Sequence, residues 1–494
     1  MIWFVQHEFK NDKIGLNAKV MKEFKIFTGK LKYRDIDFTF VFDKRDLRLI
    51  PPDEKRREIR MKWWLKEKEK GRFVPAEPII VEEEYLVGKC NETNSQIVFI
   101  PQLGSYIKGN NEIVLIELVA YIIFKNNEDY IDRVAFSCTE LNFIHPIEKA
   151  YQLEIPLDEY INNGIFSVIT RSFDDTTTDK KHFTVDGKNV SVNFGISRKT
   201  STKINEPPLQ LNTSMFFCFD KTNDYGFIYR LYRIALEFIC FLCYRKNIKM
   251  SGIELAAPSE DGKHCPVASM FIMRQCEMEE QEIIKEQRVI KQDYISGYEG
   301  KILNDIADNK LYIRHMPESY MSGRHMTAAR FVMITAAFEW EFRRLFPSGI
   351  PKSEKRNEAE KKVRTTIEQY INDSTGREKR IYKSLSKLVG NNSLKDEIIY
   401  IGKKLSEIVS VFGERLYRNN GIKELKYDEI GNRLANQRNN FAHGNLDEDF
   451  IGDSLLDLMF LEYIIYAVQL KKYGIEDKAI RKSINDLFHL NFMI

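Results

Sequence analysis

In the first half of this 494-residue chain, hydrophobic and polar positions tend to alternate with a period of two residues. Between Ile36 and Phe42, large apolar side chains occupy every second position, and Asp37 and Thr39 stand between them. This period is typical of a β-strand with one buried face. The run from Glu112 to Phe124 is apolar almost throughout, which predicts a central strand buried on both faces. The pattern therefore predicts a β-rich N-terminal region.

Three segments interrupt or punctuate this pattern. Asp186-Gly187 separates two alternating runs within residues 183–194 and predicts a hairpin, because this dipeptide tolerates positive φ angles. Residues 54–70 are rich in charge and carry two tryptophans, which favours a helix crossing an edge or end of the sheet. Asn223 or Asp224 can cap a helix near residues 223–246, whose apolar residues recur every three or four positions.

After about Ser319 the helical period takes over completely. Helices are expected at residues 324–346, 353–372, 379–389, 394–416, 427–442 and 452–473, with a short closing helix after Glu476. Glycines and one proline punctuate these segments. The predicted fold class is α+β and multidomain: a β-rich region over residues 1–275, a charged helical connector over 276–320, and an all-α bundle over 321–494.

Composition places the chain among reduced, intracellular proteins without a membrane segment. Lysine plus arginine (75) nearly balances aspartate plus glutamate (72), so any contact with a polyanion must be local. Seven cysteines without a disulfide spacing fit a reducing cytoplasm. The N-terminal residues lack the pattern of a signal peptide. Charged residues interrupt the most apolar runs, 227–243 and 455–470, so no membrane span is expected.

Two further patterns have competing interpretations. Cys240, Cys243, His264 and Cys265 are loosely spaced like zinc ligands, but the first pair lies in an apolar helix, where cysteine commonly serves as a small core residue. Basic residues between 361 and 383 are interleaved with glutamates. Such runs are typical of solvated helix faces, and the alternative is a track for an RNA backbone.

The segment with the clearest chemistry is residues 436–445, NQRNNFAHGN, at the end of a predicted helix. Arg438 carries a permanent planar charge that can bind two phosphate oxygens and stabilise a pentacoordinate transition state. His443 can exchange a proton with a ribose 2′-hydroxyl or a leaving 5′-oxygen near neutral pH. Asn439 shares a helix face with His443. These residue types suit phosphodiester cleavage without a metal or another cofactor.

The same residues also have structural interpretations that need no catalysis. Arg438 can instead pair with Asp447 or Glu448, and His443 can simply lie near a helix C-terminus, where the dipole favours its cation. Glu339, in a strongly apolar helix about a hundred residues upstream, can pair with Arg343 one turn on. In the functional interpretation, Glu339 orients Arg438 or His443.

The run RNNFAH, within a helical region, resembles the Arg-polar-x-x-x-His signature of HEPN ribonucleases. The resemblance covers roughly residues 320–494 and is specific at Arg438, Asn439 and His443. Residues 335–346, TAAFEWEFRRLF, resemble the first conserved helix of these domains, with Glu339 as the acidic residue. The resemblance implies that Arg438 and His443 are catalytic, that Asn439 and Glu339 support them, and that two copies of the chain form a homodimer in which their sites are paired. Because the internal 2′-oxygen would be the nucleophile, the expected products are a 2′,3′-cyclic phosphate and a 5′-hydroxyl.

The order of the two regions is similar to that of the ApeA group of bacterial anti-phage proteins, which act by abortive infection and cleave host tRNA. This architectural resemblance implies an RNA substrate, tRNA in that group, and a phage-derived trigger sensed by the N-terminal region. The competing hypothesis is that the protein is not catalytic. In this hypothesis the helices form a dimerisation or adaptor module, and the β-rich region binds a ligand or a protein.

Overall fold

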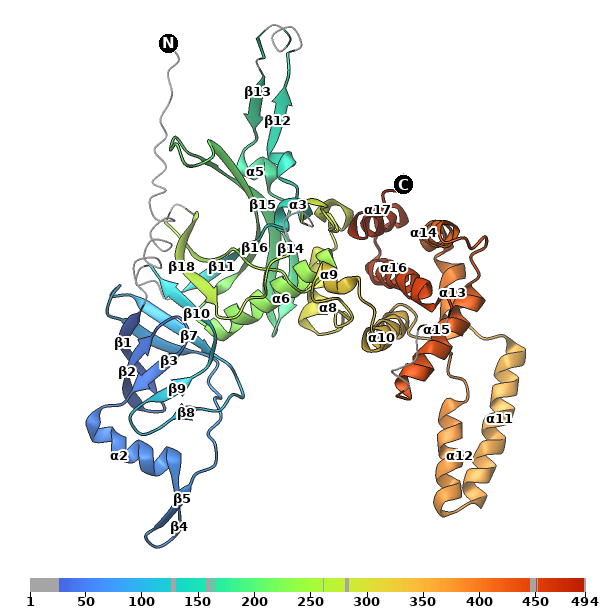
Figure 1. The fold of residues 1–494 in the computed structure, drawn as a ribbon, viewed down its shortest axis with the longest axis horizontal. Helices are drawn as coiled ribbons and strands as arrows, with labels where there is room; N and C mark the ends of the chain where they lie inside the picture. The colour runs from blue at the N-terminus through green and yellow to red at the C-terminus, as the bar shows by residue number, and fades with distance from the viewer. Residues whose placement is uncertain are drawn as a thin grey trace. The chain divides into compact units, whose positions relative to one another are not determined.

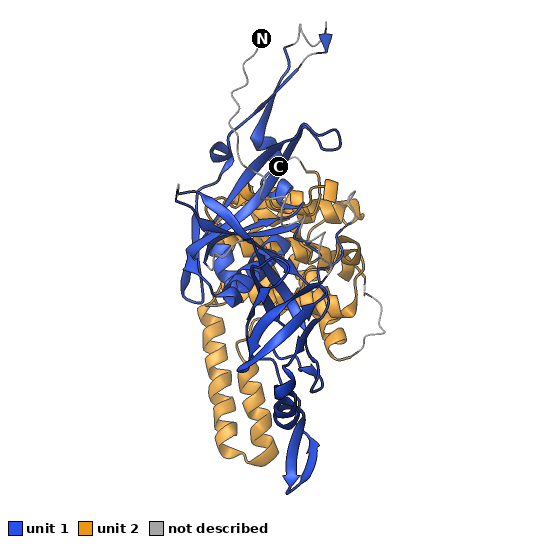
Figure 2. Ribbon diagram, turned by 90° about the vertical axis from the view of Figure 1, so that its left-hand side faces the viewer, with its two compact units in different colours: residues 1–240, 247–280, 299–307 blue, residues 241–246, 281–298, 308–494 orange. Residues whose placement is uncertain are grey.

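The computed structural model describes residues 26–125, 130–156, 161, 163–164, 166–260, 262–279, 284–444, 450 and 452–492. The N-terminal run and part of the charged run 277–288 therefore lie outside the described residues. The chain divides into two compact units (Figure 2). Unit 1 comprises residues 1–240, 247–280 and 299–307, and unit 2 comprises residues 241–246, 281–298 and 308–494. A short piece of the β-rich half, residues 241–246, thus packs with the helices.

Unit 1 is built on one antiparallel sheet, in which fourteen strands of the described chain join edge to edge (Figure 1). Across the sheet the strands are β14 (Lys181–Val185), β15 (Lys188–Thr200), β16 (Leu209–Thr222), β11 (Ile131–Ser137), β17 (Gly252–Pro258), β18 (His264–Ile272), β10 (Leu118–Phe124), β7 (Gln96–Pro101), β6 (Leu86–Cys90), β1 (Phe27–Tyr33), β2 (Ile36–Phe42), β3 (Leu47–Ile50), β9 (Val114–Ile116) and β8 (Lys108–Gly109). The predicted β-rich N-terminal half is confirmed.

Alternation of apolar and polar residues explains which face of the sheet is buried. In β2 every second residue is buried, and Phe40 and Phe42 both pack edge to face against Phe99 of β7. The predicted hairpin is present: β14 and β15 pair around Asp186 and Gly187, whose φ angles are 51° and 76°. These positive angles are what a tight two-residue turn requires.

Two predictions within unit 1 were wrong in detail. The helix expected over residues 54–70 ends at Trp64, after the short α2 (Arg56–Ile59) and one π-helical turn, Arg60–Trp64. The remaining charged residues form β4 (Leu65–Glu69), which pairs with β5 (Arg72–Pro75) across Gly71 at φ 80°. The single strand expected over residues 112–124 is two strands, β9 and β10, separated at Glu117. Beyond Glu117, β10 lies between β7 and β18, as expected of a central strand.

Short elements complete unit 1. They are the small hairpin of β12 (Tyr151–Glu154) and β13 (Ser167–Thr170), and the helices α3 (Leu141–Ile144), α5 (Phe173–Thr176), α6 (Tyr225–Cys243) and α8 (Glu299–Ala307). The cap predicted for the helix near residue 223 is Asp224, whose Oδ1 accepts the backbone N–H of Phe227 at 2.8 Å. The end of α6 crosses into unit 2 at Phe241.

Unit 2 contains helices only, as far as the structure describes its residues, which confirms the predicted all-helical region. Besides the end of α6 and a 3-10 turn at Gln292–Tyr294, they are α9 (Tyr320–Gly323), α10 (Ala328–Leu345), α11 (Glu354–Asp373), α12 (Gly376–Leu388), α13 (Leu394–Lys404), α14 (Ser406–Asn419), α15 (Tyr427–Ala442), α16 (Ser454–Tyr473) and α17 (Asp477–Leu487). The helix expected over residues 394–416 is interrupted at Leu405, which has φ −114° and ψ 23°. Neither glycine nor proline marks this break.

Helix α16 is the centre of unit 2 and is buried along most of its length. Four of its buried residues, Ser454, Asp457, Glu462 and Gln469, are polar or charged, and each has a partner within the unit; Ser454 donates to Gln437 at 3.3 Å. Asp457 binds Arg433, Glu462 binds Arg330 at 2.8 Å, and Gln469 contacts Glu341 at 3.3 Å. These pairings matter because an unpartnered buried charge is costly. No helix within the described residues is both long and apolar enough to cross a membrane.

Candidate active site

Helix α15 carries the segment that sequence analysis singled out. Its buried side consists of Ile430, Leu434, Gln437 and Phe441, which recur every three or four residues. This anchoring leaves Arg438 half-buried beside the core, whereas Asn439 and His443 are exposed. The apolar period therefore decides which polar side chains of α15 reach the surface.

Arg438 forms an ion pair with Glu339 of α10, 99 positions earlier in the chain. Its Nη1 donates to Oε1 of Glu339, and its Nη2 lies 3.4 Å from Oδ1 of Asn439. The Arg438 and Glu339 side chains keep 27% and 22% of their surface exposed, so solvent reaches the pair. The structure thus brings together three of the four residues predicted for the site.

Arg438 and Glu339 each had another candidate partner in the sequence. Asp447 and Glu448, the other candidate partners of Arg438, lie outside the described residues. Glu339 also approaches Arg343, but its Oε2 is 4.0 Å from that guanidinium. Glu339 therefore stands between two arginines and binds Arg438 more closely. The orienting role of Glu339 stays a prediction.

His443 is the first residue after α15. Its backbone N–H donates to the carbonyl of Asn439 at 3.0 Å, and Gly444 follows at φ 91°. Its side chain is exposed and makes no hydrogen bond with the described residues. No contact joins its ring to Arg438 in this structure, so His443 lies at the same end of the helix without completing a catalytic pair.

Sequence analysis missed Glu397, which belongs to the electrostatic surroundings of Arg438. It lies on α13 with 5% of its surface exposed, and its Oε2 has no hydrogen-bond partner among the described residues. The pKa of Glu397 is raised to about 8, chiefly by burial and also by the nearby charge of Glu339, while Arg343 and Arg438 oppose the rise. The sequence signal was a glutamate within the apolar stripe of α13, beside Leu394, Ile398 and Ile401.

A second arginine of α15, Arg433, has a different environment. Its Nε and Nη2 lie 2.6 and 2.8 Å from the two carboxylate oxygens of Asp457. The Asp457 side chain is fully buried and also accepts a hydrogen bond from Tyr417. Arg433 therefore neutralises a core carboxylate, whereas Arg438 pairs with a carboxylate that solvent reaches.

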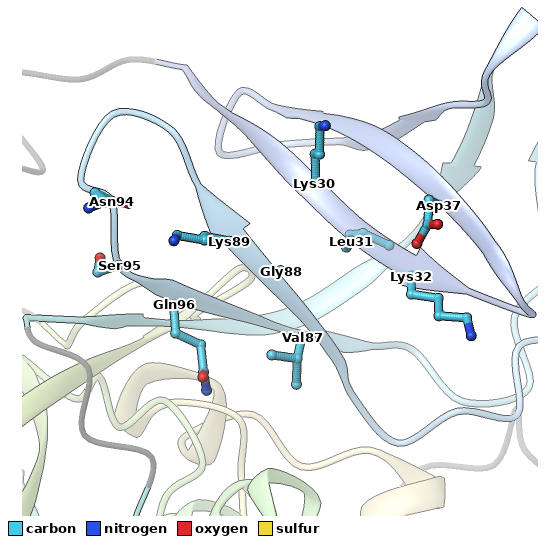
Figure 3. A pocket seen from close by; sticks show the side chains of 10 residues that line it. All are labelled: Lys30, Leu31, Lys32, Asp37, Val87, Gly88, Lys89, Asn94, Ser95 and Gln96. Atoms are coloured by element: carbon cyan, nitrogen blue, oxygen red, sulfur yellow. The ribbon is translucent and has the colours of Figure 1, made fainter.

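Other candidate sites offer less chemistry. Within the described residues, no group of three or more histidine, cysteine, aspartate or glutamate side chains could hold a metal ion, and this includes Cys240, Cys243, His264 and Cys265. His264 instead lies 3.3 Å from Asp132. A shallow hollow of about 710 Å³ on β1, β6 and β7 is lined by Lys30, Lys32 and Lys89, with Asp37 as its carboxylate (Figure 3).

Comparison of the chain with protein-family models, with curated proteins and with solved structures finds no match.

Proposed function

We propose that unit 2 is a metal-independent endoribonuclease centred on Arg438 and His443. The observation that supports this most directly is the Arg438–Glu339 pair. A carboxylate from a distant helix binds the partly exposed guanidinium, five residues before the exposed His443. An arginine needed only for folding would pair with a fully buried carboxylate, as Arg433 does with Asp457.

In the proposed reaction the ribose 2′-oxygen attacks the adjacent phosphorus, and the bond from phosphorus to the 5′-oxygen breaks. A proton leaves the 2′-hydroxyl and a proton reaches the 5′-oxygen, so the products are a 2′,3′-cyclic phosphate and a 5′-hydroxyl. His443 carries one of these protons. Arg438 stabilises the charge that builds on the phosphoryl oxygens. Glu339 and Asn439 hold the guanidinium in place.

The wider function follows from the same proposal. Two copies of the chain pair their Arg438 and His443 sites in a homodimer. The β-rich unit 1 senses a phage-derived trigger, and the helical unit then cleaves cellular RNA, with tRNA as the substrate, in abortive infection. The RNNFAH signature and the order of a β-rich region before the helices support this interpretation.

Wild-type protein and the His443→Ala variant, each incubated with bacterial tRNA and total RNA, test the proposal. Parallel reactions contain lysate from phage-infected cells to supply a trigger. The His325→Ala variant serves as the matched control, because His325 is another exposed histidine of unit 2. Loss of a proton carrier should lower cleavage by about 10²- to 10⁴-fold in His443→Ala alone. Mapping the cleaved ends should find cyclic phosphates.

Equal cleavage by wild type and His443→Ala, including no cleavage by either, would overturn the proposal.

A further inference from the structure

Helices α11 and α12 form a hairpin arm in unit 2, which Figures 1 and 2 show as two adjacent helices extending away from the others of that unit. Neither helix contains a buried residue. They pack mainly on each other, and the rings of Tyr370 and Tyr382 stack with centroids 5.1 Å apart. At the base of the arm, Lys352 Nζ binds Glu360 at 2.7 Å and the carbonyl of Gly390 at 2.6 Å. The arm is therefore an ordered element that contributes little to the core.

The two helices of the arm differ sharply in charge. Helix α11 has five basic and five acidic residues, so its net charge is zero, and Arg356 pairs with Glu360 at 3.1 Å. Helix α12 has five basic residues against one acidic residue, Glu378, a net charge of +4 within 13 residues. None of these five basic side chains forms an ion pair with the described part of the chain. They are Arg377, Lys379, Arg380, Lys383 and Lys387.

Helical geometry gathers these charges on one side of α12. At 3.6 residues per turn, Arg377, Arg380, Lys383 and Lys387 fall within an arc of about 120° and span about 15 Å along the axis. The apolar residues lie on the other side, where Tyr382 meets α11. The basic stripe therefore faces away from the partner helix and into solvent.

Folding does not explain this stripe. Like charges three or four residues apart repel each other along a helix and destabilise it. A polyanion with regularly spaced charges would relieve that repulsion and release its own counterions. An amphipathic basic helix can also bind an anionic membrane through its apolar face. On α12, Tyr382 stacks against Tyr370 of α11, whereas Ile381, Leu385 and Leu388 are exposed. Membrane binding is therefore the competing outcome that the test must separate from RNA binding.

We propose that α12 binds the phosphodiester backbone of the RNA substrate through Arg377, Arg380, Lys383 and Lys387. This inference rests on the proposed function, because it assigns the contact by which unit 2 holds its RNA. The interaction is independent of base sequence, since such contacts position a nucleic acid without reading it.

The test measures binding of RNA that cannot be cleaved. The probe is a single-stranded oligonucleotide with 2′-O-methyl groups, so no internal nucleophile is available. The full chain is compared with a triple variant, Arg380→Gln, Lys383→Gln and Lys387→Gln, over a series of salt concentrations. Each lost phosphate contact should reduce the slope of log affinity against log salt by about 0.7, so three contacts remove about 2. When salt rises from 50 to 200 mM, the fold-loss of RNA affinity should therefore be about 16 times larger for wild type than for the variant.

A matched control removes three charges from α11: Lys355→Gln, Lys361→Gln and Lys362→Gln, all at exposed positions. It should leave the slope nearly unchanged, because acidic neighbours already balance these lysines. Glutamine has a helix propensity close to that of lysine and arginine, so circular dichroism should show both variants folded.

An unchanged slope in the α12 variant would overturn the inference. Binding of anionic lipid vesicles that the α12 variant loses, with RNA affinity intact, would overturn it in favour of a membrane partner. Because the probe is not cleaved, these results do not depend on whether His443 is catalytic.

Discussion

Arg433 and Arg438 lie five residues apart on α15 and are similarly exposed, but Arg433 binds a fully buried carboxylate and Arg438 a partly exposed one, which predicts opposite consequences when each is replaced by alanine. Arg433→Ala leaves the fully buried Asp457 carboxylate without its positive partner. Breaking a buried pair in this way costs about 3–5 kcal/mol. Arg438→Ala breaks a pair that solvent reaches, and Glu339 retains Arg343 at 4.0 Å. That loss should stay near or below about 1 kcal/mol.

Calorimetry and RNA cleavage together give the measurement. For a unit of this size each kcal/mol shifts the melting temperature by about 2–4 °C, so Arg433→Ala should lower it by about 6–20 °C. Arg438→Ala should lower it by no more than about 4 °C. Cleavage should show the reverse order: Arg438→Ala should lose activity, whereas Arg433→Ala should retain it well below its melting temperature.

A second substitution checks the cause of the instability. In the Arg433→Ala background, Asp457→Asn should recover part of the lost stability, because the buried group no longer carries a charge. Comparable melting temperatures for the two arginine variants would refute the assignment of Arg433 to folding and Arg438 to chemistry. So would loss of cleavage in Arg433→Ala at a temperature where it remains folded.

Three further predictions concern the proposed site. Cleavage should persist in excess EDTA, since the proposed mechanism needs no metal; activity that stops and returns with a divalent metal would contradict it. Arg438→Lys should recover little activity, because an ammonium cannot reproduce the two-oxygen fork of a guanidinium; wild-type turnover would argue against phosphate binding by Arg438. Raising the pH from about 4.5 to 8 should destabilise wild type relative to Glu397→Gln, because the native state holds a proton on Glu397 that the unfolded state releases. If the stabilities of wild type and Glu397→Gln changed equally with pH across this range, burial would not raise the Glu397 pKa.

The sequence predicted those features of the fold that depend on local periodicity. The alternation in β2, the Asp186-Gly187 turn and the bounds of α15 were all visible in the pattern of residues. The break at Leu405 and the conversion of residues 65–69 into β4 were not, because tertiary pairing decides them. Residues 66–70 alternate lysine and glutamate, a pattern that fits an exposed strand as well as an exposed helix.

For the candidate site, residue types were predictable and pairings were only partly so. Glu339 and Arg438 were both singled out from the sequence. Arg343 was an equally acceptable partner for Glu339, and Asp447 or Glu448 was an equally acceptable partner for Arg438. The contact of α10 with α15 makes Arg438 the closer partner of Glu339. Arg433 and Glu397 were missed for a related reason. Their significance comes from burial against residues of other helices, which local spacing does not encode.

The balance of charge around Arg438 depends on whether Glu397 is ionised. The chain carries a net charge of only +3 in 494 residues. Arg343 and Arg438 bring positive charge to this cluster, and Glu339 and Asp396 oppose it, while the raised pKa of Glu397 keeps that buried carboxyl from adding a further negative charge at neutral pH. The clearest excess of positive charge in unit 2 lies on α12, with a net charge of +4 within 13 residues. Such a local excess attracts a phosphodiester backbone, which the almost neutral chain as a whole would not.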